Sequence, residues 1–491
     1  MKKYFWIMFT TLALAGSSCK KDFLELSTNP NVPSVGSPSL LLSGALKTSA
    51  AIVNGGGYTM YACWGGYLSW STGYQPNVAL VAYQVNSATF DVWTAPYLNL
   101  ANYKAITTAT TEPYFQAIAK IMTVYMYEGL VDNYNNVPYT QALQGTGNLN
   151  PAYDNGSAIY DDLLKQLDAA IVLIQNAPVT ALNPGSSDIM YGGKMGNWLK
   201  FANTLKLRLA LRQSNVSAKT TALKAAVAAT ATLGYIDATN PALVNPGYLS
   251  SDANGGQQSP LWITYGYTSN GSRQAFNQQY QANSYAAAAL SVNNDPRSLV
   301  VYDTTGRKGL VLSTKFGQTT PPAGGAPSTY GAGVLKAPTM NATIMSAAEA
   351  LFLQAEGVKS GYIPTGNAAT LYNAGVTASF IDDGFTAAQA TTYLAVAANA
   401  YPTAGTDAQQ EQAIITQKWK ALAGYGVFEA YNELRRTGYP NDIPLSIYPG
   451  NSNTTNVARI PYPAVEYRSN AGNVAAQGTI DIFNSKIFWA K

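Results

Sequence analysis

The sequence predicts a mostly α-helical protein with a tetratricopeptide-like scaffold of helix pairs, a long irregular loop-rich lobe and few short strands. Three observations support this fold class. Apolar residues recur at helical spacing in several long segments, and small residues stand where helices would cross. The stretch 234–340 is dense in Gly, Ser, Asn, Pro and Tyr and shows little periodicity, which indicates an irregular lobe. No clean period of about 34 residues is present, so the scaffold is predicted from the helix pairs alone.

The beginning of the chain predicts a lipoprotein leader. Two lysines precede an apolar run that ends in small residues directly before Cys19. About 12 apolar residues fall short of the roughly 20 that span a bilayer, so residues 1–18 are typical of a secretory signal peptide. Small residues before a cysteine resemble a bacterial lipobox, although Gly16 stands where a lipobox usually has Leu. Cys19 is therefore predicted to be lipidated and to become the first residue of the mature protein.

The rest of the chain is predicted to form one domain. Residues 19–38, rich in Pro and Asn, are expected to be an extended tether, and residues 39–491 a single helical domain. Helices are expected at 39–52, 112–130, 159–174, 195–212 and 219–233, then from Ser346 to Gly361, at 368–380, and at 407–436 with a break near Gly424 and Gly426. Ser346 and Glu349 fit a capping box at the start of the helix that ends at Gly361.

The helix at 195–212 is the clearest of these, and the others are expected to pack around it. One face carries Trp198, Phe201, Leu205 and Leu209 at spacings of three and four. Its cations are predicted to lay their methylene stems along apolar surface and to keep their charges in water, as a solvated border: Lys200, Lys206, Arg208 and Arg212.

Composition excludes several classes of function. Charged residues make up 11% of the chain, below the roughly 25% that is usual, and the polar remainder suits a carbohydrate-facing surface. The net charge is +4, but the basic residues form no stripe that could neutralise phosphate groups, which argues against a nucleic-acid-binding protein. With no histidine and two cysteines, His-dependent catalysis and structural zinc are excluded, and no cofactor or metal is predicted. The residues that follow Asp132 do not have the spacing of ligands in an EF-type calcium-binding loop.

Aromatic side chains crowd the segment 58–97, with uncharged amides between them and no Lys or Arg. Sugar rings present apolar faces and hydroxyl edges, so a glycan site needs flat aromatic rings beside polar groups. The segment is therefore predicted to bind a neutral glycan, although any single aromatic residue here is equally compatible with a place in the core. The candidate ligand-binding residues are Trp64, Trp70, Tyr74, Gln75, Asn77 and Tyr83, and in the lobe Trp262, Tyr265 and Arg273; Trp70, Tyr74 and Tyr83 are expected to be exposed.

A series of motifs in order resembles the SusD/RagB family of outer-membrane nutrient-binding lipoproteins. The series begins with the leader that ends at Cys19 and covers nearly the whole chain. It continues with Asp22-Phe23-Leu24, Asn29-Pro30-Asn31, VPYTQAL at 137–143, MYGGK with WLKFANTLKLRLALR at 190–212, NDPR at 294–297, IMSAAEALFLQAEG at 344–357, LYNAGVTASF at 371–380, ITQKWKAL at 415–422, ELRRTGYP at 433–440 and RIPYP with Glu466 at 459–466.

The resemblance implies a helical binding protein that is not an enzyme. Such proteins are held at the cell surface by the lipid on their first cysteine. They sit as a lid on a SusC-like TonB-dependent outer-membrane transporter and capture glycans, or in some members peptides, for import. The ligand-binding residues vary within the family, so none carries over. The matching charged residues are expected to form structural pairs: Glu433, Arg435, Arg436 and Glu466.

Two alternatives stay open. The first is a peptide-binding lid or a scaffold with no small ligand; a pocket for an anionic peptide would show clustered Lys or Arg near the aromatic residues, and the segment 58–97 contains none. A glycoside hydrolase would need two carboxylates about 5–9.5 Å apart across a cleft. The adjacent pairs Asp161-Asp162 and Asp382-Asp383 do not suit this role, because sequence neighbours on a helix point apart.

Overall fold

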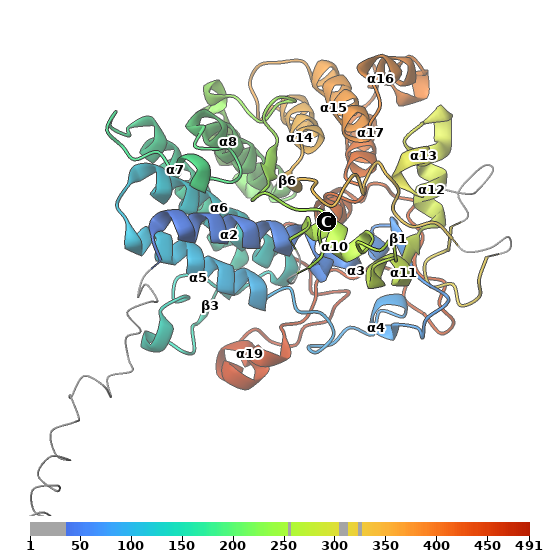
Figure 1. Cartoon of the computed structure of the whole chain (residues 1–491), viewed down its shortest axis with the longest axis horizontal. Helices are drawn as coiled ribbons and strands as arrows, with labels where there is room; N and C mark the ends of the chain where they lie inside the picture. The colour runs from blue at the N-terminus through green and yellow to red at the C-terminus, as the bar shows by residue number, and fades with distance from the viewer. Residues whose placement is uncertain (1–35, 254–256, 304–312, 323–326) are drawn as a thin grey trace, which may run out of the picture.

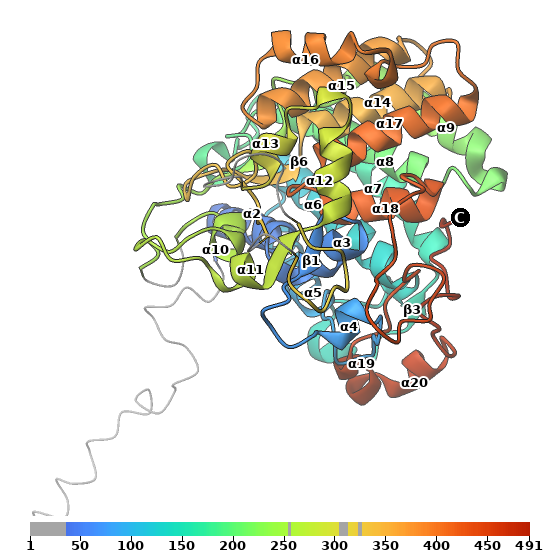
Figure 2. The same cartoon turned by 90° about the vertical axis from the view of Figure 1, so that its right-hand side faces the viewer.

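The computed structural model of the chain is shown in Figures 1 and 2. It describes residues 36–253, 257–303, 313–322 and 327–491. The predicted leader 1–18, the lipidation site Cys19 and nearly all of the predicted tether lie outside the described residues.

Long helices dominate the fold, and each packs against its neighbour in the chain, as predicted for a tetratricopeptide-like scaffold. Figure 1 shows α2, α5 and α6 side by side, with α7 and α8 beyond them. The first series comprises α2 (Pro38–Asn54), α5 (Thr94–Ala109), α6 (Pro113–Tyr134), α7 (Gly156–Gln175), α8 (Met195–Arg212) and α9 (Thr220–Ala228).

A second layer of helices packs on α8 through α14 and has its own small hydrophobic core. Figure 2 shows this layer at the top, opposite α4, α19 and α20. It comprises α14 (Ala347–Lys359), α15 (Ala368–Asp382), α16 (Ala387–Leu394) and α17 (Asp407–Ala421), followed by α18 (Val427–Thr437). The predicted break is confirmed, because α17 ends before Gly424 and α18 begins after Gly426.

Local sequence explains where these helices begin. Asn155 caps α7, since its side-chain oxygen accepts hydrogen bonds from the backbone N–H groups of Ser157 and Ala158. Ser346 caps α14 by accepting from the N–H of Glu349, as predicted. The Glu349 side chain reaches Arg208 of α8 instead of turning back to the cap. A tertiary ion pair has therefore replaced the second half of the predicted capping box.

Helix α5 was not predicted from the sequence. Its buried face includes Leu100, Tyr103 and Ile106, and it is interrupted by the polar residue Asn99. The amide of Asn99 donates to the Ala45 carbonyl oxygen at 3.1 Å, so this polar residue is satisfied inside the helix interface. A polar residue on the inner face hides the apolar stripe from a pattern search.

The predicted irregular lobe contains more helix than strand in its described parts. It holds four short helices, α10 (Pro260–Tyr265), α11 (Ala275–Gln279), α12 (Ser284–Ser291) and α13 (Ser298–Val301). Other short helices are α3 (Thr59–Trp64), α4 (Val78–Val81), α19 (Ala464–Ser469) and α20 (Ala471–Ala475).

The strands pair in twos, all antiparallel. The pairs are β1 (Leu68–Trp70) with β5 (Tyr280–Ala282), β2 (Val137–Pro138) with β3 (Tyr153–Asp154), and β4 (Ala242–Val244) with β6 (Ala342–Met345). The third pair joins the beginning of the lobe to the residues that directly follow its end. The first pair ties the lobe to the aromatic segment and positions the candidate site.

Candidate functional site

The β1–β5 pair brings the aromatic segment against the lobe. In its register Trp70 lies opposite Tyr280. The Trp70 ring meets the Tyr280 ring edge to face, with centroids 5.2 Å apart and planes at 89°, and the Tyr74 ring at 6.4 Å and 71°. The Trp70 indole N–H donates to the Gln75 carbonyl oxygen at 3.0 Å. These contacts fix a half-buried tryptophan at the end of a short strand, with its ring held but not enclosed.

A pocket of ≈ 230 Å³ opens beside Trp70. In Figure 1, β1, α4 and α11 lie near one another at the lower right, apart from α2, α5 and α6. The pocket, here termed the rim pocket, is lined by aromatic, amide, hydroxyl and aliphatic side chains, and none of its described lining residues is charged. These residues are Trp70, Ser71, Thr72, Tyr74, Gln75, Pro76, Val81, Gln318, Thr319 and Tyr448.

Tyr74 forms the exposed edge of the rim pocket. The residue is 39% exposed, and its hydroxyl group donates to the Gln278 Oε1 atom at 3.1 Å. Gln278 belongs to α11, and its Nε2 donates to the Arg273 carbonyl oxygen at 3.0 Å. One polar chain therefore joins the aromatic segment to the lobe at the mouth of the pocket, and its groups also suit sugar hydroxyls.

Trp70, Tyr74 and Gln75 are the predicted site residues that the structure brings together in this pocket. The expected exposure is confirmed for Tyr74, whereas Trp70 is partly buried. Asn77 lies just outside the pocket, where its side chain accepts from the Leu80 N–H and caps α4.

The prediction is wrong for three of the site residues, because they lie in the hydrophobic core. Trp64 is 1% exposed, and its indole N–H donates to the Leu80 carbonyl oxygen. Tyr83, expected to be exposed, is 3% exposed, and its oxygen accepts from the Ser446 N–H. Tyr265 is buried and shares a hydrogen bond with Thr59. A ligand at the surface cannot reach these rings, so their role is packing.

The remaining two candidates lie in the lobe outside the rim pocket. Trp262 is partly buried, and its indole N–H donates to the Tyr267 carbonyl oxygen at 2.9 Å. Arg273 is exposed, with its Nη2 atom 4.0 Å from the Asp303 carboxylate.

The sequence did not predict several residues that line the pocket or its mouth: Gln278, Gln318, Thr319 and Tyr448. No local signal marks them, since tertiary structure alone brings them to Trp70.

The predicted solvated border on α8 is wrong, because three of its four cations are buried. Lys206, Arg208 and Arg212 are all buried, and only Lys200 is partly exposed, beside Asp237. Arg208 donates to both carboxylate oxygens of Glu128, at 3.0 and 2.5 Å, and to Glu349 at 3.0 Å. The prediction failed because the ion partners of Arg208 and Arg212 come from helices remote in sequence.

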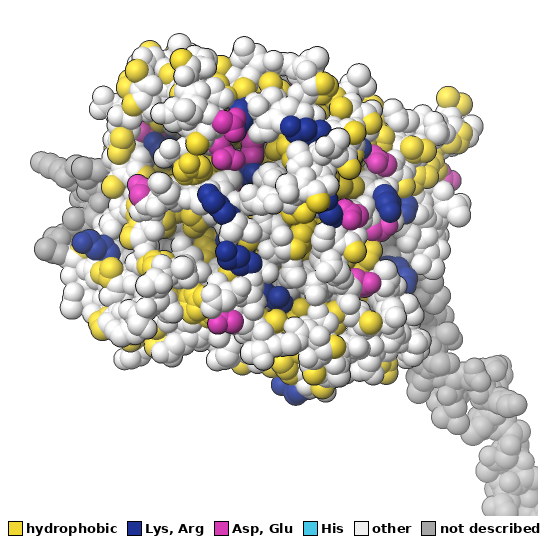
Figure 3. All heavy atoms as spheres, turned by 180° about the vertical axis from the view of Figure 1, so that it is seen from behind, with side chains coloured by type: hydrophobic (Ala, Val, Ile, Leu, Met, Phe, Trp, Pro, Cys, Tyr) yellow, Lys and Arg dark blue, Asp and Glu magenta, His cyan; other side chains and the backbone are white. Residues whose placement is uncertain are grey.

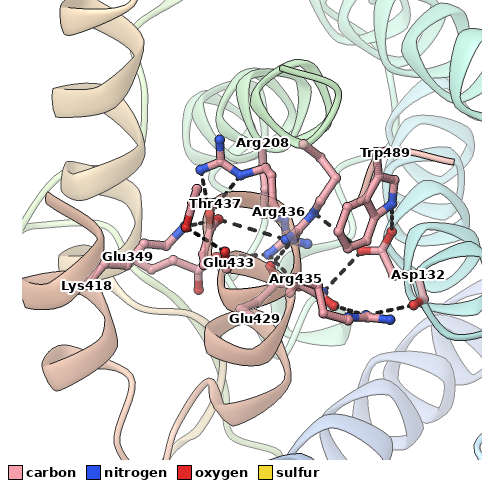
Figure 4. Close-up of polar contacts among 12 residues, drawn as sticks. Asp132, Arg208, Glu349, Lys418, Glu429, Glu433, Arg435, Arg436, Thr437 and Trp489 are labelled. Atoms are coloured by element: carbon pink, nitrogen blue, oxygen red, sulfur yellow. Dashed lines mark hydrogen bonds and ion pairs between the residues drawn. The ribbon is translucent and has the colours of Figure 1, made fainter. Parts of the chain in front are cut away.

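Figure 4 shows these groups as one buried charge network among α6, α8, α14, α17 and α18. The network comprises Glu128, Asp132, Arg208, Arg212, Glu349, Glu356, Lys418, Glu429, Glu433, Arg435 and Arg436. The expected structural roles are confirmed for Glu433 and Arg436, which pair with each other in the core. Glu466, by contrast, accepts from the hydroxyl group of Tyr153 near the surface.

Burial and ion pairing compete in this network. Burial raises the pKa of Glu128 to about 7, although the Arg208 guanidinium opposes the shift. Burial acts in the same direction on Glu433, but Arg436 and Lys418 outweigh it and hold the pKa of that carboxyl below its usual range.

Asp132, the residue considered for a calcium-binding loop, accepts from the Trp489 indole N–H at 2.8 Å. Its place in the network is structural.

The carboxylate pairs considered for hydrolysis occupy separate surroundings. Asp161 pairs with Lys219 at 2.6 Å, whereas Asp162 accepts from the Tyr139 hydroxyl group at 2.5 Å.

Across the described ranges, no group of three or more Cys, Asp or Glu residues is arranged to hold a metal ion. No helix in the described part of the chain has the length and apolar character to cross a membrane.

The fold is that of a helix-pair protein with loops and a pocket on one side. The chain belongs to the SusD-like family, because the family model described as starch-binding and associating with the outer membrane matches residues 30–463. No curated protein resembles the chain significantly in sequence.

Solved structures show the same fold at low sequence identity. A chitin-binding SusD homologue from Flavobacterium johnsoniae has a TM-score of 0.74 at 24% identity, covering 91% of this chain and 98% of its own. A SusD homologue from Bacteroides uniformis has a TM-score of 0.72 at 23% identity, covering 92% and 99%. A SusD-like protein from Bacteroides thetaiotaomicron has a TM-score of 0.73 at 22% identity, covering 91% and 98%. The resemblance inferred from the motifs is thereby confirmed.

Proposed function

We propose that this protein is a cell-surface lipoprotein that binds a neutral glycan in the rim pocket and delivers it to a SusC-like TonB-dependent transporter. The observation that carries the proposal is the chemistry of the pocket wall. Trp70, Tyr74 and Tyr448 offer aromatic surface, Gln75 and Gln318 offer amides, and no described lining residue is charged. Aromatic rings match the apolar faces of sugars, and amides match their hydroxyl groups.

The same chemistry argues against the alternatives at this pocket. An ionised peptide would leave its charges without partners in a wall that has none, which costs binding free energy. Hydrolysis of a glycosidic bond would need two carboxylates beside the sugar, and no described lining residue supplies one. Figure 3 shows the molecule from behind relative to Figure 1, and on this face Lys and Arg side chains stand singly or in small groups on a mostly uncharged surface. This surface offers little to a polyanion such as nucleic acid.

The ligand is tested by calorimetric titration of the full chain against a panel of soluble polysaccharides and peptide digests. We expect saturable heat with one neutral glycan and no new reducing ends. Trp70→Ala and Tyr74→Ala should weaken this binding at least tenfold, whereas Tyr467→Ala, at an equally exposed tyrosine on α19, should not. Heat with peptides only, or release of sugar, would overturn the proposal.

The anchor and the transporter need separate tests. Lipidation of Cys19 predicts that a palmitate analogue labels the full chain in cells and that Cys19→Ser abolishes both labelling and membrane recovery. Delivery predicts that the protein co-purifies with a TonB-dependent transporter from detergent-solubilised outer membranes. Recovery of the unlabelled chain in the soluble fraction, or purification without such a transporter, would contradict these parts.

A further inference from the structure

A second pocket, of ≈ 320 Å³, lies between the second helix layer and the β4–β6 pair. Figure 1 shows β6 between α14 and the α2–α10 region. The walls come from β4 and β6, from the loop that leads into β6, from the C-terminal end of α15 and from the turn between α17 and α18. The lining residues are Pro241, Leu243, Lys336, Ala337, Thr339, Met340, Asn341, Thr343, Ser346, Asp382 and Tyr425.

Two opposite charges line this pocket without meeting. Lys336 and Asp382 both belong to its wall, yet within the described residues neither side chain takes part in a hydrogen bond or an ion pair. The contact that holds Lys336 is with the face of Tyr425, with the ammonium nitrogen 5.3 Å from the ring centroid. Lys336 is exposed and Asp382 is partly buried, so both charges remain accessible to a ligand that enters the pocket.

The end of a helix and a neighbouring side-chain amide add to the polarity of the pocket wall. Asp382 is the last residue of α15, where the unpaired carbonyl groups of the helix favour a cation. Asn341 also lines the pocket; its side-chain oxygen accepts from the side chain of Asn245 at 2.9 Å, which leaves the Asn341 amide N–H groups to donate. The wall therefore offers Asp382 to a cation and Lys336 and Asn341 to an anion.

Another part of the wall is apolar. Leu243, Met340 and the ring of Tyr425 supply it. The volume is at the lower end of the roughly 300–1,000 Å³ usual for small-molecule sites, which limits the ligand to about one or two amino-acid residues. A ligand that satisfies every wall carries an ammonium group, a carboxylate and an apolar side chain.

We propose that this pocket binds a small apolar zwitterion, either a free amino acid or a dipeptide, with its ammonium group on Asp382 and its carboxylate on Lys336. The pocket shares no lining residue with the rim pocket, and the chemistry of the two is opposite. This second site therefore stands independently of the proposed glycan site.

The test is calorimetric titration of the full chain at pH 7 with leucine and with leucyl-leucine, which distinguishes a free amino acid from a dipeptide. We expect one of them to bind saturably at millimolar or lower concentration. Leucine amide lacks the carboxylate and N-acetylleucine lacks the ammonium group, so each should bind at least tenfold more weakly than leucine. For a dipeptide ligand, its amide and N-acetyl derivatives are compared in the same way.

Variants assign the heat to the pocket. Lys336→Gln and Asp382→Asn should each weaken zwitterion binding at least tenfold, whereas Lys47→Gln, at an exposed lysine on α2, and Trp70→Ala should leave it unchanged. Circular dichroism of both pocket variants checks that they fold. Absence of saturable heat with both ligands, or equal heat after both pocket substitutions, would overturn the proposal and leave the glycan proposal untouched.

Discussion

The buried charge network and the rim pocket divide the polar chemistry of this protein between them. In the network, guanidinium and carboxylate groups from distant helices pair with one another in the core. In the rim pocket, the lining side chains are uncharged, and Tyr74, Gln75 and Thr319 among them are exposed. A buried ion pair requires its partners for stability, whereas an uncharged pocket offers groups that a neutral ligand can match. The buried pairs stabilise the scaffold, whereas the uncharged groups of the rim pocket remain available to a ligand.

The largest effect is expected from Arg208→Met. This change leaves Glu128 and Glu349 buried without their cation, so we expect the free energy of unfolding to fall by about 3–5 kcal/mol. Lys200→Met on the same helix is the matched control, because its partly exposed pair with Asp237 should contribute no more than about 1 kcal/mol. Chemical denaturation at pH 7 measures both variants. Equal losses would show that burial does not distinguish the two pairs.

Two tryptophans only six positions apart in the chain sharpen the comparison. Trp64→Ala should destabilise the fold by about 3–5 kcal/mol, because it empties a core site, while folded protein keeps its ligand affinity. Trp70→Ala should have the reverse profile, with a smaller loss of stability and at least a tenfold loss of glycan affinity. Denaturation and calorimetry on both variants test the assignment. Loss of affinity in correctly folded Trp64→Ala protein would contradict it.

Asp383 predicts a pH dependence of stability. Burial raises the pKa of this carboxyl from 3.8 to about 7, in the presence of Arg297, Asp382, Lys336 and Asp295. The folded state therefore holds a proton that the unfolded state loses near pH 4, so this stabilising contribution is present below pH 4 and is lost as pH rises through about 7.

Asp383→Asn should remove this dependence, since the amide stays neutral. Relative to the unaltered protein, the variant should gain about 2–4 kcal/mol of unfolding free energy between pH 4 and pH 8. Denaturation curves at several pH values measure the difference. A difference that stays constant across this range would show that Asp383 titrates normally in the fold.

The smallest effect is expected at the mouth of the rim pocket. Tyr74→Phe keeps the ring but removes the hydroxyl group that donates to Gln278. A net hydrogen-bond contribution of about 0.5–1.5 kcal/mol predicts a loss of glycan affinity of about 2- to 13-fold, with stability little changed. Titration beside Tyr74→Ala separates the two roles, because the ring should account for most of the affinity. Equal losses in both variants would assign the affinity to the hydroxyl group instead.

Much of this protein is determined by its sequence alone. Apolar residues at spacings of three and four predicted α7 and α8, because a regular stripe can be buried only as a helix. The glycines at 424 and 426 predicted the break before α18. The aromatic density around Trp70 and Tyr74, without lysine or arginine, pointed to the uncharged pocket that the fold contains.

Tertiary structure decided which of these residues face inward. Trp64, Tyr83 and Trp70 lie in one aromatic segment, yet only Trp70 reaches the rim pocket, because β1 pairs with β5 from the lobe. Arg208 has the sequence pattern of a solvated helix border and is buried, because Glu128 and Glu349 arrive from two other helices. Burial depends on partners that are far away in the chain, and a local sequence pattern does not identify them.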